Sequence, residues 1–263
     1  EFMRGVTKRF VIVGGVAAGA TAAARIRRLD EEAEITLLER GPYVSFANCG
    51  LPYHISGDIE KRSKLILQTP EGFLSRYRVT VRLNSEVVSI DRTVKEVTLK
   101  NGERIPYDYL ILAQGGSPVI PALPGVDYPH VFKLWTIPDM DAINRYIKEK
   151  SPQTAVVVGG GFIGLETAEA FVKRGIQVTL VELMDRLMPT LDFPYGRRIQ
   201  ERFESEGVKV VVGKGLSAIE EKRVFLQDGT SLPADLVLLS VGVKPNVELA
   251  EAAGLSIGST GAL

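Results

Sequence analysis

The sequence predicts an α/β protein built from two three-layer units, and two observations favour this class. An apolar strand, a glycine-rich turn, a helix, a second strand and an acidic residue follow one another twice, ending first at Glu39 and again at Glu182. This layout is typical of a dinucleotide-binding, Rossmann-like unit. The chain of 263 residues fits one large domain or two smaller ones, and its 45% hydrophobic content supports a real core.

The first unit opens with the apolar run Phe10–Val13, which ends at the turn Gly14–Gly19. A helix to about Leu29 follows, and a second strand is closed by Glu39. The turn places backbone N–H groups under a pyrophosphate, and Glu39 lies where an acceptor for a ribose hydroxyl is expected. Because Val16 stands where the middle glycine of G-x-G-x-x-G belongs, a bare packing turn stays an alternative.

Thr21, Arg25 and Arg28 share one face of the helix after this turn, because their offsets are four and three. One hydroxyl and two guanidinium groups in a row could hold a phosphorylated ligand. Arg27 lies beside them and acidic residues follow. The spacing alone therefore favours a solvated basic edge.

The stretch Tyr43–His54 contains Cys49, the only cysteine of the chain. Unpaired cysteines are usually small buried hydrophobes, but polar Ser45 and Asn48 precede this one and Gly50 follows it. Its place between two nucleotide units suggests sulfur redox chemistry fed by a flavin and a nicotinamide. If a helix starts at Cys49, the partial positive charge of its N-terminus favours the thiolate. A single cysteine excludes an intrachain disulfide and fits a reducing, cytoplasmic location.

A domain boundary is expected between the two units. The strands predicted before it are Val79–Ile90, Val94–Leu99 and Tyr107–Ala113. Four prolines then fall between Ser117 and His130, and this shift in composition marks a connector. We therefore expect a first domain over residues 1–118, a second over 119–246 and a short last segment over 247–263.

The second unit carries a complete G-x-G-x-x-G motif, Gly159–Gly164, directly after the strand Ala155–Val158. Glu182 closes its second strand, where a carboxylate accepts from a ribose 2′-OH and repels a 2′-phosphate. NADH is therefore preferred over NADPH, although nearby Arg186 weakens the preference. The elements expected after it are a charged helix Asp192–Glu206, strands Val208–Val212, Val224–Leu226 and Leu236–Val241, and a short helix Val247–Ala253.

Composition narrows the possible partners. The formal net charge of +0 argues against nucleic acid or an acidic membrane surface as a bulk partner. No apolar run reaches the length of a bilayer span. Glu1 and Phe2 precede Met3 as a cloning remnant would, and no signal peptide is recognised after them.

These motifs together resemble the FAD-dependent pyridine nucleotide–disulfide oxidoreductases over essentially the whole chain. Within that family the chain is most similar to the single-cysteine branch of coenzyme A-disulfide reductases, NADH-dependent persulfide or polysulfide reductases, and NADH oxidases and peroxidases. The motifs that carry the resemblance are Gly14–Gly19 with Glu39, Ser45–Tyr53, Ala113–Gly115, Gly159–Gly164 with Glu166, and Val241–Asn246. The run Ser45–Tyr53 resembles the coenzyme A-disulfide and persulfide reductases more than the oxidases.

The resemblance implies roles for individual residues, with Cys49 as the redox nucleophile. The positions that match FAD contacts are Gly14, Val16, Ala17, Glu39, Arg40, Val87, Ala113 and Gly115. Those that match nicotinamide-nucleotide contacts are Gly159, Gly161, Phe162, Ile163, Gly164, Glu182 and Gly242. Those that match coenzyme A contacts are Thr21, Arg25, Arg28, Ser45 and Asn48. The resemblance thus reverses the expectation that spacing alone gave for the arginine face.

The implied activity is hydride transfer from NADH, with NADPH possible, to FAD and then to a sulfur substrate through Cys49. That substrate is coenzyme A disulfide, coenzyme A persulfide or polysulfide. The nearest alternative is an NADH oxidase or peroxidase that uses a cysteine sulfenic acid. A non-catalytic nucleotide-binding module is the alternative from another class.

The resemblance also implies a longer parent chain. Chains of this family normally run on for about one more domain's length, completing the FAD site and adding a dimerisation domain. Residues 247–263 are therefore expected to start the return to the FAD domain, and the parent protein is expected to be a homodimer.

Overall fold

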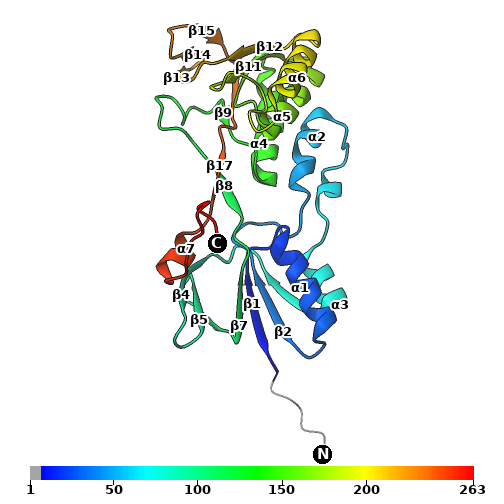
Figure 1. Cartoon of the computed structure of the whole chain (residues 1–263). Helices are drawn as coiled ribbons and strands as arrows, with labels where there is room; N and C mark the ends of the chain where they lie inside the picture. The colour runs from blue at the N-terminus through cyan, green and yellow to red at the C-terminus, as the bar shows by residue number, and fades with distance from the viewer. Residues whose placement is uncertain (1–6) are drawn as a thin grey trace, which may run out of the picture. The chain divides into compact units, whose positions relative to one another are not determined.

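The computed structural model describes residues 7–263, so the cloning remnant expected at Glu1 and Phe2 lies outside the described residues. By its contacts the chain divides into two compact units. Unit 1 comprises the chain up to Ala47, Ser63–Ser117 and Lys244–Leu263, and unit 2 comprises Asn48–Arg62 and Pro118–Val243. Figure 1 follows the chain through these segments by colour.

The stretch 48–62 is where this division differs most from sequence order. Sequence order assigns it to the first domain, whereas its contacts assign it to unit 2. The domain limits at residues 118 and 246 stay a prediction.

Unit 1 is built on a parallel sheet in the order β3-β2-β1-β7. These strands are β1 Arg9–Val13, β2 Glu34–Leu38, β3 Val79–Arg82 and β7 Tyr109–Leu112. Helices α1 (Ala18–Leu29) and α3 (Pro70–Tyr77) contact the sheet, and Ile12, Leu37 and Phe73 are buried in its core. Because neighbouring parallel strands end at the same edge, the segments after β1, β2 and β7 meet there.

A small antiparallel sheet completes unit 1. Its strands are β4 Val87–Asp91, β5 Glu96–Leu99 and β6 Arg104–Pro106, and α7 (Glu248–Ala252) lies against β4. The predicted strand Val79–Ile90 is therefore wrong as a single element. It forms β3 and β4 in two different sheets, and between them Asn84 takes a left-handed backbone conformation with φ +51°. The short strands β8 (Gly116–Pro118) and β17 (Val243–Pro245) pair with each other.

Unit 2 is built on a parallel five-stranded sheet in the order β12-β11-β10-β16-β9. Its strands are β9 Val131–Phe132, β10 Thr154–Val158, β11 Gln177–Glu182, β12 Lys209–Val212 and β16 Leu236–Leu239. Its longer helices are α4 Ile137–Lys150, α5 Phe162–Lys173 and α6 Phe193–Ser205. An antiparallel sheet of β13 Leu216–Glu220, β14 Arg223–Leu226 and β15 Ser231–Pro233 shares its core with one face of the parallel sheet. The predicted α/β class with two Rossmann-like units is confirmed.

Helices α3 and α4 have no counterpart among the sequence predictions. Each follows a threonine whose hydroxyl accepts a hydrogen bond from the backbone N–H three residues later, from Gly72 to Thr69 (3.1 Å) and from Asp139 to Thr136 (3.4 Å). The Asp139 carboxylate accepts in return from the Thr136 N–H at 2.8 Å, which completes a capping box. None of the helices formed by residues 7–263 is long and apolar enough to cross a bilayer.

Candidate functional site

The first glycine turn is shaped by close contact between backbones. Gly14 has φ +97°, a conformation that side chains rarely tolerate, and a Cβ there would collide with the carbonyl oxygen of Ala113. A Cβ on Gly19 would collide with the carbonyl oxygen of Gly14. The start of α1 therefore packs directly on the turn, with the end of β7 on its other side.

Glu39 spans this turn with its carboxylate. The side chain is buried; one oxygen accepts from the Gly15 N–H at 2.8 Å and the other from the Gly41 N–H at 2.7 Å. An ionised carboxylate has about four acceptor positions, so two hydrogen bonds leave capacity for ribose hydroxyls.

The other residues predicted to contact FAD all lie in unit 1. Val16, Val87 and Ala113 are half-buried, whereas Ala17, Arg40 and Gly115 are exposed. Hydrogen bonds from Gly14 N–H to the Leu38 carbonyl and from Ala113 N–H to the Val13 carbonyl, both 2.8 Å, bring the ends of the three strands together. Val87 belongs to the separate antiparallel sheet. Its assignment, like the set as a whole, stays a prediction.

The second glycine turn repeats this arrangement in unit 2. Gly159 has φ +107°, and a Cβ there would collide with the carbonyl oxygen of Ser240. The buried Glu182 carboxylate accepts from the Gly160 N–H at 2.6 Å and from the Met184 N–H at 2.8 Å. Both units thus hold an acid against a glycine turn by the same pair of backbone contacts.

A dinucleotide pyrophosphate fits the second turn. A Cβ on Gly161 would meet no atom within 4 Å, so the backbone there faces open space. Gly161 is also the N-cap of the twelve-residue helix α5, whose first N–H groups have no intrahelical acceptor. Of the other residues predicted there, Ile163 is half-buried, Gly164 is buried, and Phe162 and Gly242 are exposed.

The Arg186 guanidinium is engaged by its own loop. It donates to an Asp185 carboxylate oxygen at 2.8 Å and to the Pro189 carbonyl at 3.1 Å, and it lies 5.9 Å from the centre of the Phe193 ring. These contacts compete with its use as a partner for a 2′-phosphate.

Cys49 is exposed, so the alternative of a small buried hydrophobe is wrong. The thiol lies in the 3₁₀ turn Asn48–Gly50, which leads straight into α2 (Leu51–Ser56). The helical segment thus begins one residue before the predicted start, and the α-helix proper two residues after it. The Cys49 sulfur is 4.0 Å from the Asn48 side-chain oxygen.

Ser45 is buried and adopts a left-handed backbone conformation with φ +46°. Its N–H donates to the Gly15 carbonyl at 2.8 Å, and its carbonyl accepts from the N–H groups of Leu67 and Gln68. The stretch before Cys49 is therefore fastened to the first glycine turn through Ser45.

The basic face of α1 has two parts. Thr21, Arg25 and Arg28 are exposed, and within residues 7–263 no hydrogen bond or ion pair is found for either arginine side chain. Arg27 is buried instead, so its assignment to a solvated edge is wrong.

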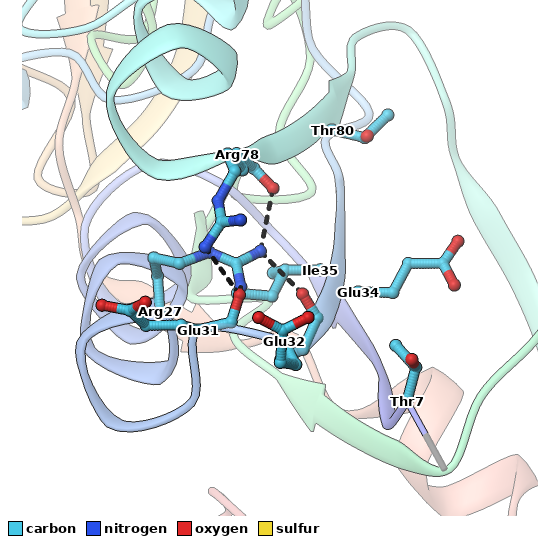
Figure 2. Close-up of a pocket in the computed structure, with 9 residues that line it drawn as sticks. Thr7, Arg27, Glu31, Glu32, Glu34, Ile35, Arg78 and Thr80 are labelled. Carbon is cyan, nitrogen blue, oxygen red and sulfur yellow. Dashed lines mark hydrogen bonds between the residues drawn. The ribbon is translucent and has the colours of Figure 1, made fainter. Parts of the chain in front are cut away.

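All five N–H groups of Arg27 are used by backbone carbonyls. They donate to the carbonyl oxygens of Asp30, Glu31, Ala33, Tyr77 and Arg78 at 2.6–3.1 Å. Arg27 is one of the residues that line a surface pocket of about 350 Å³, and Figure 2 shows its side chain among them. Arg27 joins the ends of α1 and α3, and no donor is left for a ligand.

Two glycine turns with buried acids, on two parallel sheets, are typical of the class of proteins that bind two dinucleotides. The chain belongs to the pyridine nucleotide-disulphide oxidoreductase family, whose model matches residues 8–263. The resemblance seen in the sequence is thereby confirmed.

Three similar proteins show how close the match is. The NAD(P)H sulfur oxidoreductase (CoA-dependent) of Pyrococcus abyssi is 40% identical over 98% of this chain and 58% of its own length. The NADH oxidase of Methanocaldococcus jannaschii is 35% identical over 95% of this chain and 58% of its own. The structure of a NAD-dependent persulfide reductase from A. fulgidus matches with a TM-score of 0.93 and 38% identity, over 97% of this chain and 49% of that one. The chain thus spans a little over half of the curated relatives' length.

Proposed function

We propose that the full-length protein is an NADH-dependent flavoprotein that reduces a disulfide or persulfide, with coenzyme A disulfide, coenzyme A persulfide or polysulfide as substrate. The observation that carries this proposal is the exposed thiol of Cys49, on a segment whose helix α2 packs in unit 2 against α5, the helix that begins at the second glycine turn. The Pyrococcus abyssi relative, named as a CoA-dependent sulfur oxidoreductase, supports it.

In this proposal each unit holds one dinucleotide. Unit 1 binds FAD through the turn Gly14–Gly19 and the carboxylate of Glu39, and unit 2 binds NADH through Gly159–Gly164 and Glu182. FAD, when bound, accepts a hydride from NADH and supplies two electrons to sulfur. Glu182 favours NADH because both of its oxygens are fixed at the turn, where they repel a 2′-phosphate.

Cys49 acts as the nucleophile. Its thiolate attacks one sulfur of a disulfide RSSR, which forms a Cys49–S–S–R bond and releases RS⁻. Two electrons then break that bond and regenerate the thiolate, so that NADH, H⁺ and RSSR give NAD⁺ and two RSH. With a persulfide RSSH, the sulfane sulfur passes to Cys49, and the products are RSH and H₂S.

The exposed residues Thr21, Arg25 and Arg28 of α1 are proposed to bind the phosphates of coenzyme A, because the two guanidinium groups and the Thr21 hydroxyl are available as hydrogen-bond donors to them. Ser45 and Asn48 are proposed to hold the thiolate or the substrate sulfur. A homodimer and a cytoplasmic location stay predictions.

Substitution of Cys49 tests the proposal in the full-length protein. We expect Cys49→Ser to abolish reduction of coenzyme A disulfide, with a loss of at least about a thousandfold, because serine cannot form the mixed disulfide. Bleaching of the flavin absorbance by NADH is expected to be unchanged. Sulfur reduction that survives this substitution would contradict the proposal.

The M. jannaschii relative, named as an NADH oxidase, favours a second candidate. There Cys49 is oxidised by peroxide to a sulfenic acid, and NADH, H⁺ and H₂O₂ give NAD⁺ and two waters. Steady-state assays with coenzyme A disulfide, polysulfide and peroxide, run side by side, separate the two. Faster peroxide turnover would replace the first proposal, and a purified protein without flavin absorbance would favour a nucleotide-binding module.

A further inference from the structure

The segment 48–62, which carries Cys49, is held in unit 2 by apolar and polar contacts. Its helix α2 packs against α5 and α4, with Leu51 and Ile55 buried. Figure 1 shows α2 alongside these helices. Because α5 begins at the second glycine turn, the thiol segment and the nucleotide turn share one supporting helix.

Three polar contacts fasten the segment 48–62 to α4 and to the end of α5. The Arg62 guanidinium donates to both carboxylate oxygens of Asp141 on α4, at 2.8 and 2.7 Å. Lys173 on α5 forms an ion pair with Asp58 at 2.9 Å, and Arg174 donates to the Ile55 carbonyl at 3.1 Å. The contact between Arg62 and Asp141 is the one with two parallel bonds, which fixes orientation as well as distance.

We propose that Arg62 and Asp141 are positioning residues that fix the Cys49 segment on unit 2 and hold the thiol at one place relative to the second glycine turn. The inference deepens the proposed function and rests on it. Cys49 and Arg62 are thirteen positions apart on one continuous excursion of the chain. The contact at Arg62 therefore limits how far the segment 48–62, and Cys49 with it, is able to move along α4 and α5.

The contact between Arg62 and Asp141 affects the position of the segment more than the stability of the fold. Both side chains are partly exposed, and ion pairs between partly exposed side chains contribute little to the stability of a fold. Loss of the pair thus leaves the fold intact. A displacement of about 1 Å at a reacting group is able to slow a reaction by up to about a hundredfold. The reaction rate is therefore the more sensitive property.

Amide hydrogen exchange of the full-length protein tests the docking directly. The variants are Arg62→Gln, Asp141→Asn and the double exchange Arg62→Asp with Asp141→Arg. We expect peptides from residues 48–62 to exchange about threefold faster in both single variants, and to recover in the double exchange.

The matched control is Arg82→Gln in unit 1. Arg82 forms a similar double contact with Glu103, with side-chain exposures of 32% and 44% against 38% and 35% for Arg62 and Asp141. This control is expected to leave exchange in 48–62 unchanged. Unchanged exchange in the Arg62 and Asp141 variants would overturn the proposal.

Rapid-mixing kinetics then show whether a loosened segment 48–62 also leaves the Cys49 thiol less well positioned for the reaction. In both single variants we expect reduction of the flavin by NADH to be unchanged and its reoxidation by coenzyme A disulfide to be about tenfold slower, with recovery in the double exchange. Faster exchange with undiminished reoxidation would also overturn the proposal. If the wild-type protein does not reduce coenzyme A disulfide, the proposed function fails, and the exchange pattern still decides whether Arg62 and Asp141 dock the segment.

Discussion

At the scale of single residues, arginine has two different roles on helix α1. Arg25, Arg27 and Arg28 follow one another closely on α1, and Arg27 alone turns inward. Burial lowers the pKa of Arg27, mainly through desolvation, yet five carbonyl oxygens satisfy every N–H of its guanidinium. Such a group is structural, whereas its exposed neighbours remain available for a ligand.

Replacement of Arg27 by lysine tests this structural role. An ammonium group has three donors at one point and cannot reach five carbonyls on two helix ends, so we expect the free energy of unfolding to fall by about 2–3 kcal/mol. Urea denaturation followed by circular dichroism measures the change. Arg28→Lys on the exposed face is the control, with an expected change within about 0.5 kcal/mol. Equal effects of the two substitutions would contradict the assignment.

His130 provides a pH test in unit 2. Its side chain is only 3% exposed, and no hydrogen-bond partner of its Nε2 is found among residues 7–263. Burial lowers the pKa of His130 below its ordinary value of 6.5, so the unfolded chain binds a proton more readily than the folded one. The free energy of unfolding therefore decreases as the pH falls below about 6.5, where His130 of the unfolded chain begins to bind a proton.

Denaturation at pH 7.5 and 5.5 measures this effect. From His130 we expect a loss of at most about 1.4 kcal/mol at pH 5.5, and His130→Phe is expected to remove that loss. His54→Gln, at the only other histidine, is expected to retain it. A wild-type response that persists in His130→Phe would assign the titration to other groups.

At the scale of elements, helix ends decide where the supporting helices lie. The capping box of Thr136 and Asp139 starts α4, the helix that carries Asp141. The Asp139 carboxylate also accepts from the Trp135 N–H at 3.2 Å, so one side chain serves two backbone donors before the helix. The position at which α4 begins thus depends on the four residues Thr136–Asp139, which form the capping box.

Removal of the Thr136 hydroxyl tests this cap. We expect Thr136→Ala to lower the free energy of unfolding by about 1 kcal/mol, since the Asp139 N–H loses its acceptor. Thr136→Ser keeps the hydroxyl and is expected to retain most of the stability. Thermal melts followed by circular dichroism compare the two, and similar losses in both variants would attribute the effect to packing of the methyl group.

At the scale of the whole molecule, the protein has two cores and one segment, residues 48–62, that lies between two parts of unit 1 in the sequence but belongs to unit 2 by its contacts. The strands of each parallel sheet all belong to one unit, and each glycine turn lies within about 25 residues of its acid in the sequence. The segment with Cys49 differs, because its sequence neighbours belong to unit 1 and its contacts to unit 2. Contacts distant in the sequence therefore place the residue on which the proposed chemistry depends.

The sequence by itself determined both nucleotide turns and their acids, since each is a short pattern in which glycine geometry and strand periodicity act over about thirty neighbouring residues. It also singled out Cys49. Only the tertiary structure decided that Cys49 is exposed, that Arg27 is buried, and that Arg62 meets Asp141 on α4. These outcomes depend on which surfaces pack together after the chain has folded. Neither the period of a helix nor the spacing of charges contains that information.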